Sequence, residues 1–196
     1  MIKVLVVVVA ILMPAWAMAG EPLFDAVAAG DVSKIESLLA GGATVDQRGP
    51  DQATPLIAAA LNGQEAASKL LLSKGADVMA RNSGGFTALH AAAYSGSAPI
   101  AALLLDSGAA RDDNKNKAGT APVFVAAEMN HPGVVELLIA RGADVSQPEA
   151  HGYSALTRAI FKGHKDMMRL LKRHGLTCQH EKLSAGHYVQ CLELKD

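Results

Sequence analysis

Apolar and polar positions along this chain recur with a period of 33 residues. Five equivalent strings begin at Glu21, Thr54, Thr87, Ala121 and Ser154, which lie 33, 33, 34 and 33 positions apart. Each string opens an alanine-rich apolar segment, which is followed by a polar turn, a second apolar segment and a glycine. A fixed period of this size predicts a solenoid, in which short units stack on one another.

The third unit illustrates the elements that the pattern predicts. Residues 88–94 have helical apolar spacing, Ser95 and Gly96 turn the chain, and residues 99–106 form a second helix that Gly108 ends. The second helices carry pairs of leucine or isoleucine one turn before the terminal glycine, at 38–39, 71–72, 104–105, 138–139 and 170–171. One unit cannot bury this surface alone, so stability should come from contacts between neighbouring units.

The motif residues resemble those of the ankyrin repeat. Residues 85–92 (Gly-Phe-Thr-Ala-Leu-His-Ala-Ala) and 137–145 (Leu-Leu-Ile-Ala-Arg-Gly-Ala-Asp-Val) match the two halves of its pattern. The resemblance extends from Glu21 to about Cys178. It implies an all-α ankyrin-repeat solenoid of five helix-turn-helix units with hairpin-like connecting loops, and a protein-binding role. The expected units are about 20–52, 53–85, 86–118, 119–151 and 152–178.

Four of the five units depart from the family pattern. In the family, a threonine and a histidine hydrogen-bond locally and tie one unit to the next, and only the third unit keeps both, as Thr87 and His90. In the other units the position of the histidine is occupied by Phe24, Ile57, Phe124 and Thr157. Apolar packing should replace the hydrogen bonds in these units, with Phe24 and Phe124 in the core. The fourth unit also has Ala121 for threonine and one extra residue, so we expect it to be the least regular.

Residues 1–19 lie outside the repeat and have the layout of a secretory signal peptide. Lys3 precedes an apolar run over 4–13, Pro14 breaks it, and Ala17-Met18-Ala19 offers a cleavage site. The run is shorter than the roughly 20 residues that a membrane span needs. We therefore expect a cleaved export signal, a mature chain from about Gly20, and a periplasmic or secreted location. An uncleaved N-terminal anchor is the alternative.

The charge balance of the expected mature chain argues against nucleic acid as a partner. Without Lys3 it has 17 Lys and Arg against 19 Asp and Glu, a formal net charge of −2. Proteins that bind nucleic acid usually carry a concentrated basic face. No second apolar stretch is long enough to span a bilayer. The expected protein is soluble, monomeric when free and not attached to a membrane after cleavage.

The C-terminal segment, 179–196, is too divergent to form a sixth unit, and we expect it to cap the fifth. Cys178 and Cys191 flank part of it, and in an exported protein such a pair favours a disulfide. The same sulfurs, with His180 and His187, also have the ligand types of a tetrahedral zinc site. Free or intermolecular thiols are the third possibility.

Two other candidates for chemistry fail on spacing. Residues 112–117 have oxygen ligands at alternate positions, but Lys117 and Val123 stand where a calcium loop needs glycine and a bidentate glutamate, which favours a solvated loop tip. His151 lies near Ser154 without a nucleophile elbow, and no phosphate-binding or metalloprotease motif occurs. The sequence predicts no catalytic residue, no metal site and no cofactor.

The repeat register indicates which side chains face a partner. By the ankyrin resemblance, contacts come from two residues at the end of each first helix and one before each motif. Aromatic side chains, which often dominate binding energy, gather at these positions in the third to fifth units, where we expect the partner to bind. The candidate residues are Leu61, Asn62, Phe86, Tyr94, Ser95, Glu128, Met129, Tyr153, Phe161 and Lys162.

These observations predict a non-catalytic protein–protein interaction module in the periplasm. Small exported bacterial ankyrin proteins similar to this chain include some associated with catalase and peroxide resistance, which implies an accessory role there. Two alternatives stay open. One is an immunity protein that inhibits a toxic enzyme in the same compartment, and the other is a haem or metal carrier that uses the histidines and the tail.

Overall fold

The computed structural model describes residues 21–179, 182 and 185–193, so the expected signal peptide at 1–19 lies outside the described residues. Within these ranges the chain forms α-helices and short 3-10 segments, and no strand. The helices of the five units are α1 (Pro22–Ala29), α2 (Val32–Ala40), α3 (Pro55–Leu61), α4 (Glu65–Ser73), α5 (Ala88–Ser95), α6 (Ala98–Asp106), α7 (Pro122–Glu128), α8 (Pro132–Ala140), α9 (Ala155–Lys162) and α10 (Lys165–Arg173). The 3-10 helix η2 (Pro50–Gln52) lies in the first loop, and α11 (Ala185–Glu193) follows the last unit.

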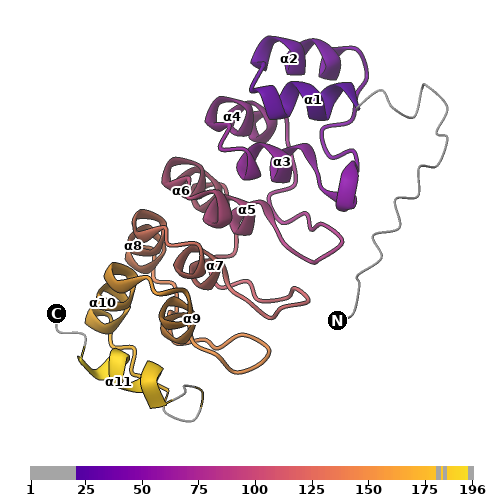
Figure 1. Cartoon of the computed structure of the whole chain (residues 1–196). Helices are drawn as coiled ribbons and strands as arrows, with labels where there is room; N and C mark the ends of the chain where they lie inside the picture. Colours follow the sequence, from indigo (N-terminus) through magenta and orange to yellow (C-terminus); the bar gives the residue numbers. More distant parts are fainter. Residues whose placement is uncertain (1–20, 180–181, 183–184, 194–196) are drawn as a thin grey trace, which may run out of the picture.

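The helices form two layers beside a row of loops (Figure 1). The odd-numbered helices α1 to α9 stack on one another in chain order, and the even-numbered helices α2 to α10 form the second layer. The long loops that join one unit to the next project to one side, away from the second layer. The molecule is therefore an open stack with a surface that the odd-numbered helices and the loops share.

Small side chains allow the odd-numbered helices to approach closely. Ala59, Ala60, Ala92, Ala126 and Ala127 are fully buried between neighbouring units. Larger side chains fill the space toward the second layer, and those with no exposed surface include Leu56, Leu71, Leu89, Ile100, Leu104, Leu138, Leu156, Met167 and Met168. One apolar core thus runs through all five units, as the repeat pattern predicts.

Neighbouring loops are joined by hydrogen bonds between their backbones. The amide of Ser83 donates to the carbonyl oxygen of Asp51 at 2.8 Å, that of Lys117 to Gly84 at 3.0 Å, and that of Ala150 to Ala118 at 3.0 Å. Each loop also closes on itself, as where Asn82 donates to Phe86 at 3.0 Å. The loops are therefore fixed relative to the helices, which lets them contribute to a binding surface.

The extra residue of the fourth unit changes a loop and not a helix. It falls between Gly108 and Ala121, in the loop that joins α6 to α7. Helix α7 has 7 residues, as α3 does, and α8 has the 9 residues of the other even-numbered helices. Ala121 makes no side-chain cap at the start of α7, whereas Thr54 and Ser154 cap α3 and α9. The irregularity of this unit is local.

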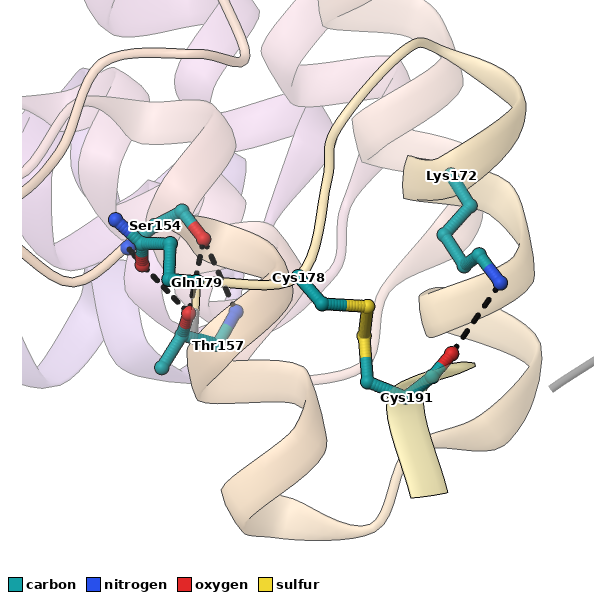
Figure 2. Close-up of a disulfide and its surroundings, with 6 residues drawn as sticks. All are labelled: Ser154, Thr157, Lys172, Cys178, Gln179 and Cys191. Atoms are coloured by element: carbon teal, nitrogen blue, oxygen red, sulfur yellow. Dashed lines mark hydrogen bonds between the residues drawn. A yellow bond between two sulfur atoms is a disulfide. The ribbon is translucent and has the colours of Figure 1, made fainter. Parts of the chain in front are cut away.

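The disulfide alternative agrees with the structure, which joins Cys178 to Cys191 (Figure 2). The bond holds α11 against α9, and Cys191 is fully buried there. Gln179 completes the last unit: its Oε1 accepts hydrogen bonds from the Ser154 amide at 2.8 Å and the Thr157 hydroxyl at 2.6 Å. Gln179 and α11 thus pack against the end of the fifth unit.

The leucine pair at 170–171 is one position out of register with the pairs of the other units. Counted back from the closing glycine of each unit, Leu171 is equivalent to Leu38, Leu71, Leu104 and Leu138, so Lys172 stands where the other units have leucine or isoleucine. The reason is the cap, because the ammonium of Lys172 donates to the carbonyl oxygen of Cys191 in the last turn of α11, at 3.3 Å. A cation at a helix C-terminus also complements the helix dipole.

None of the helices in the part of the chain that the structure describes has the length and apolar character of a membrane span.

Candidate partner-binding groove

Three exposed apolar side chains occupy the same position in three units. Leu61, Tyr94 and Phe161 are 48%, 54% and 40% exposed, and each lies in the last turn of its odd-numbered helix. The fourth unit has Glu128 at this position. In the five described units these are the exposed large hydrophobic side chains, and the other two, Val189 and Leu192, lie on α11. We call the four register-equivalent residues Leu61, Tyr94, Glu128 and Phe161 the exposed row.

Side chains of the following units hold the exposed row in place. The imidazole of His131 bonds the carbonyl oxygen of Tyr94 at 2.9 Å, and that of His164 bonds the carbonyl oxygen of Glu128 at 3.2 Å. The hydroxyl of Ser95 donates to the carbonyl oxygen of Ala60, next to Leu61, at 2.8 Å. The last carbonyls of a helix have no partner within the helix, so each of these bonds fixes one helix end to the next unit.

A groove of about 370 Å³ lies beside the first three residues of the row. Helices α3, α5 and α7 supply its floor, and the loops after α4 and α6 supply one wall. Most of its lining is apolar. The lining residues are Ile57, Leu61, Asn82, Phe86, Thr87, His90, Ala91, Tyr94, Ala118, Thr120, Val125, Glu128 and Met129.

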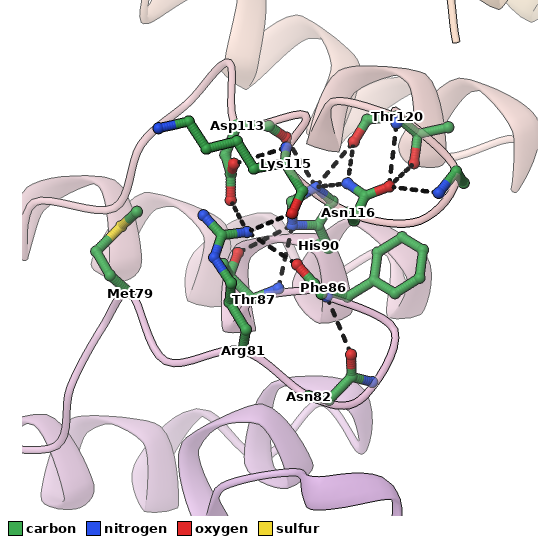
Figure 3. Close-up of polar contacts among 12 residues, drawn as sticks. Met79, Arg81, Asn82, Phe86, Thr87, His90, Asp113, Lys115, Asn116 and Thr120 are labelled. Carbon is green, nitrogen blue, oxygen red and sulfur yellow. Dashed lines mark hydrogen bonds and ion pairs between the residues drawn. The ribbon is translucent and has the colours of Figure 1, made fainter. Parts of the chain in front are cut away.

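His90 joins the floor of the groove to its loop wall (Figure 3). The Thr87 amide donates to Nδ1 of His90 at 3.3 Å, so Nε2 carries the proton and donates to the carbonyl oxygens of Asp113 and Thr120, both at 3.0 Å. The Phe86 ring meets the imidazole edge to face, with 5.4 Å between ring centres. Burial lowers the pKa of His90, which keeps the ring neutral in this network.

The loop wall contains a buried carboxylate where the sequence predicted a solvated tip. Asp113 is 7% exposed, and its Oδ2 lies 2.8 Å from a guanidinium nitrogen of Arg81. Burial alone would raise the pKa of Asp113, but the bonds from Arg81 and from the Lys115 amide outweigh it and lower the pKa. The expectation of a solvated tip was therefore wrong at Asp113, because the preceding loop supplies the partner that makes burial of the charge possible.

Five of the ten candidate residues line the groove: Leu61, Phe86, Tyr94, Glu128 and Met129. The groove lies in the second to fourth units, one unit earlier than the expected third to fifth. The rings of Phe86 and Tyr153 are half-buried, not fully exposed.

The aromatics of the fifth unit lie beside the cap. The Phe161 ring contacts Tyr153 on one side and His187 of α11 on the other, at 5.7 and 5.4 Å between ring centres. Lys162 is exposed next to them. Sequence register alone could not reveal this contact, because α11 belongs to no repeat.

Ser95 and Asn62 form hydrogen bonds within the solenoid, and Phe24 is less buried than expected. The Ser95 hydroxyl bonds Ala60, as described, and the exposed Asn62 amide donates to Ala58 of its own helix at 2.8 Å. Phe124 is buried as expected, but Phe24 is only half-buried. The Phe24 ring lies over Gly49, where a Cβ would come within 2.5 Å of ring atoms, so this contact requires glycine.

The described residues form no site that supports the catalytic or metal-binding alternatives. The Ser154 hydroxyl accepts a bond from the Thr157 amide at 3.1 Å, while the imidazole of His151 faces Glu149 at 2.8 Å. In the described ranges no three His, Cys, Asp or Glu side chains are placed to hold a metal ion, and His180 of the zinc alternative lies outside them. The disulfide uses both sulfurs that this zinc site would need.

A second hollow, of about 410 Å³, lies between the loops and is lined by paired charges. Arg81 pairs with Asp113, and Arg111 lies 3.3 Å from Asp112. These two pairs neutralise one another, and Lys115 adds one further positive charge to the lining.

Comparison with known proteins agrees with this geometry. The family model for ankyrin repeats (3 copies) matches residues 23–115 and 108–182, which is most of the chain. The chain belongs to the ankyrin-repeat family. Its all-helical stack is accordingly an ankyrin solenoid, a fold that generally binds other proteins.

The chain is also similar to mouse ankyrin repeat and SAM domain-containing protein 6. The two are 36% identical over 61 residues, which is 31% of this chain and 7% of the relative. The chain thus matches only a small part of the relative's length, so the likeness extends to ankyrin repeats and no further.

Ankyrin register could have revealed two groove residues that the sequence analysis missed. Ala91 and Val125 lie three positions before Tyr94 and Glu128, which places them on the same face of α5 and α7. Asn82 and Ala118 come from loops, and no local pattern in the sequence indicates that they line the groove. Only the packing of those loops against the helices brings them there.

Proposed function

We propose that this chain is a non-catalytic ankyrin module whose groove binds a partner protein. The observation that carries the proposal is the alignment of exposed Leu61 and Tyr94 beside an apolar groove. Burial of such side chains against a partner stabilises a complex, whereas nothing in the solenoid itself requires them to be apolar. The partner would bury the groove between the second and fourth units.

We propose further that the module works in the periplasm or outside the cell. The signal-peptide pattern of residues 1–19 supports this location, and so does the Cys178–Cys191 disulfide, since such bonds persist in oxidising compartments. An accessory role beside a peroxide-degrading enzyme is compatible with such a location. The identity of the captured partner decides between that role and inhibition of a toxic enzyme.

Site-specific photo-crosslinking tests the binding surface. A photoreactive phenylalanine at Tyr94 should capture a partner from a periplasmic extract of the source cells, and the same residue at Lys69 should not. Lys69 is a suitable control because it is exposed on α4, in the other helix layer. Capture from Lys69 and not from Tyr94 would contradict the proposal.

Point variants then measure the contribution of the groove. Truncation of a well-packed interface side chain commonly weakens binding about tenfold or more. We expect Leu61→Ala and Tyr94→Ala each to weaken the captured complex by about this factor, and Lys69→Ala to leave it unchanged. Unchanged affinity in both groove variants would place the partner elsewhere.

A further inference from the structure

The groove contains one acidic side chain, Glu128, in an otherwise uncharged lining. Glu128 is half-buried, and it lines the groove together with Val125, Met129 and Tyr94 of the preceding unit. Among the described residues, its carboxylate has no ion pair and no hydrogen-bond partner. A carboxylate beside apolar side chains interacts with an added cation more strongly than one in open solvent.

Glu128 also occupies a specific place in the exposed row. The row runs apolar, aromatic, acidic and aromatic, through Leu61, Tyr94, Glu128 and Phe161. Successive members lie on neighbouring packed helices, α3 on α5, α5 on α7 and α7 on α9. Packed helices are about 8–10 Å apart, so neighbouring members of the row should be separated by roughly 10 Å.

Apart from the carboxylate of Glu128, several polar atoms of the groove are already engaged within the protein. His90 bonds two carbonyl oxygens of the loop wall. The side-chain oxygen of Asn82 accepts from the amides of Gly84 and Phe86, both at 3.0 Å. An extended peptide would therefore lose hydration of its backbone and gain few hydrogen-bond partners in exchange. An α-helix satisfies its own backbone, which favours a helix as the occupant of an apolar groove.

The dimensions of a helix agree with the spacing of the row. Seven residues of an α-helix rise about 10.5 Å, close to the separation of neighbouring units. A helix along the row would thus present side chains one heptad apart to Leu61, Tyr94 and Glu128 in turn. The first two would meet apolar surface and the third a carboxylate.

We propose that the groove binds an amphipathic α-helix of its partner, with apolar side chains against Leu61 and Tyr94 and a lysine or arginine, one heptad further, against Glu128. This inference rests on the proposed function and specifies the chemistry of the partner. Beyond the cationic residue, such a helix would reach Phe161 if it continued for another two turns.

A peptide library tests the inference with the mature chain. The library displays an amphipathic helix of about 20 residues, randomised at three positions one heptad apart. Selection on the wild-type chain should enrich an apolar residue at the first two positions and Lys or Arg at the third. Glu128→Gln should weaken the selected peptide about tenfold, and Glu128→Lys should instead select Asp or Glu at the third position.

Glu136→Lys is the matched control, because it makes the same charge change in the same unit, on the exposed side of α8. It should leave the selection unchanged. Two outcomes would overturn the inference and leave the proposed groove intact. In one, the selected peptides show no preference for Lys or Arg at the third position. In the other, the Glu128→Lys variant selects the same peptides as the wild-type chain. If peptides are selected that still bind the Leu61→Ala, Tyr94→Ala double variant, both the groove and the inference fail.

Discussion

The ammonium of Lys172 donates a hydrogen bond to the carbonyl oxygen of Cys191, 3.3 Å away, and so links the last repeat to the helix that covers it. Lys172 replaces a leucine or isoleucine of the other four units. In those units the side chain packs against the apolar core, whereas here it bonds the C-terminal turn of α11. The substitution therefore marks the end of the stack.

Restoring the repeat pattern at this position should weaken the cap. Lys172→Leu removes the bond to Cys191, and we expect the free energy of unfolding to fall by about 0.5–1 kcal/mol. Limited proteolysis should cut the tail faster in this variant than in Lys165→Leu, which changes an exposed lysine at the other end of α10. Equal rates of cleavage would show that the bond contributes nothing to the cap.

Loss of the disulfide should loosen the same end of the molecule. The loop that Cys178 and Cys191 close corresponds to about 3 kcal/mol in the chain-entropy model. We expect the Cys178→Ser, Cys191→Ser double variant to lose up to that amount, with faster amide exchange concentrated in α11 and the fifth unit. A reductant should shift the melting temperature of the wild type toward that of the variant and leave the variant itself unchanged.

Two leucines separate binding from stability. Leu71 is fully buried, so Leu71→Ala should cost about 2–5 kcal/mol of unfolding free energy. Leu61 is 48% exposed, and Leu61→Ala should cost well under half as much. Urea unfolding of the two variants measures both values. A large loss of stability in Leu61→Ala would mean that Leu61 serves the fold and not a partner.

The free energy of unfolding should decrease as the pH is lowered, and part of this decrease should depend on His90. The pKa of His90 is lower in the folded chain than the ordinary value of 6.5, so the unfolded chain takes up this proton first as the pH falls. The contribution of His90 is present above about pH 6.5 and declines below it. Urea unfolding at about pH 7.5 and 5.5 should therefore show a smaller drop in His90→Gln than in the wild type.

The same variant has a cost at neutral pH. Removing a buried hydrogen-bonding group leaves its partners unsatisfied, so His90→Gln should lose about 1–3 kcal/mol at pH 7.5. The sign of the pH effect is the sharper test. If acidification made the wild type more stable relative to His90→Gln, the inference that the imidazole of His90 is neutral would be contradicted.

The fourth unit should be the least protected part of the stack. Ala121 leaves the start of α7 without the side-chain cap that Thr54 and Ser154 provide. We expect faster amide exchange in α7 than in α3 or α9, and Ala121→Ser should restore about 1 kcal/mol. The reverse change, Thr54→Ala, should cost a similar amount. If α7 proves the best protected helix, the missing cap is not what limits this unit.

Sequence reasoning succeeded where side chains follow the repeat. The five units, their paired helices and the exposed places of Leu61, Tyr94 and Phe161 follow from a fixed period, because equivalent positions in a solenoid have equivalent neighbours. It failed where a residue contacts something outside the register. Asp113 is buried because the preceding loop brings Arg81 to it, and Lys172 points at a cap that no other unit has.

By itself, then, the sequence determined the architecture and the row of side chains on the odd-numbered helices. The tertiary structure alone decided that loops after α4 and α6 close one side of that row into a groove, and that His187 of α11 contacts Phe161. The physical reason is the separation along the chain of the residues that interact. Helical spacing within one unit sets which way a side chain faces, but contacts between loops and the cap depend on how whole units stack.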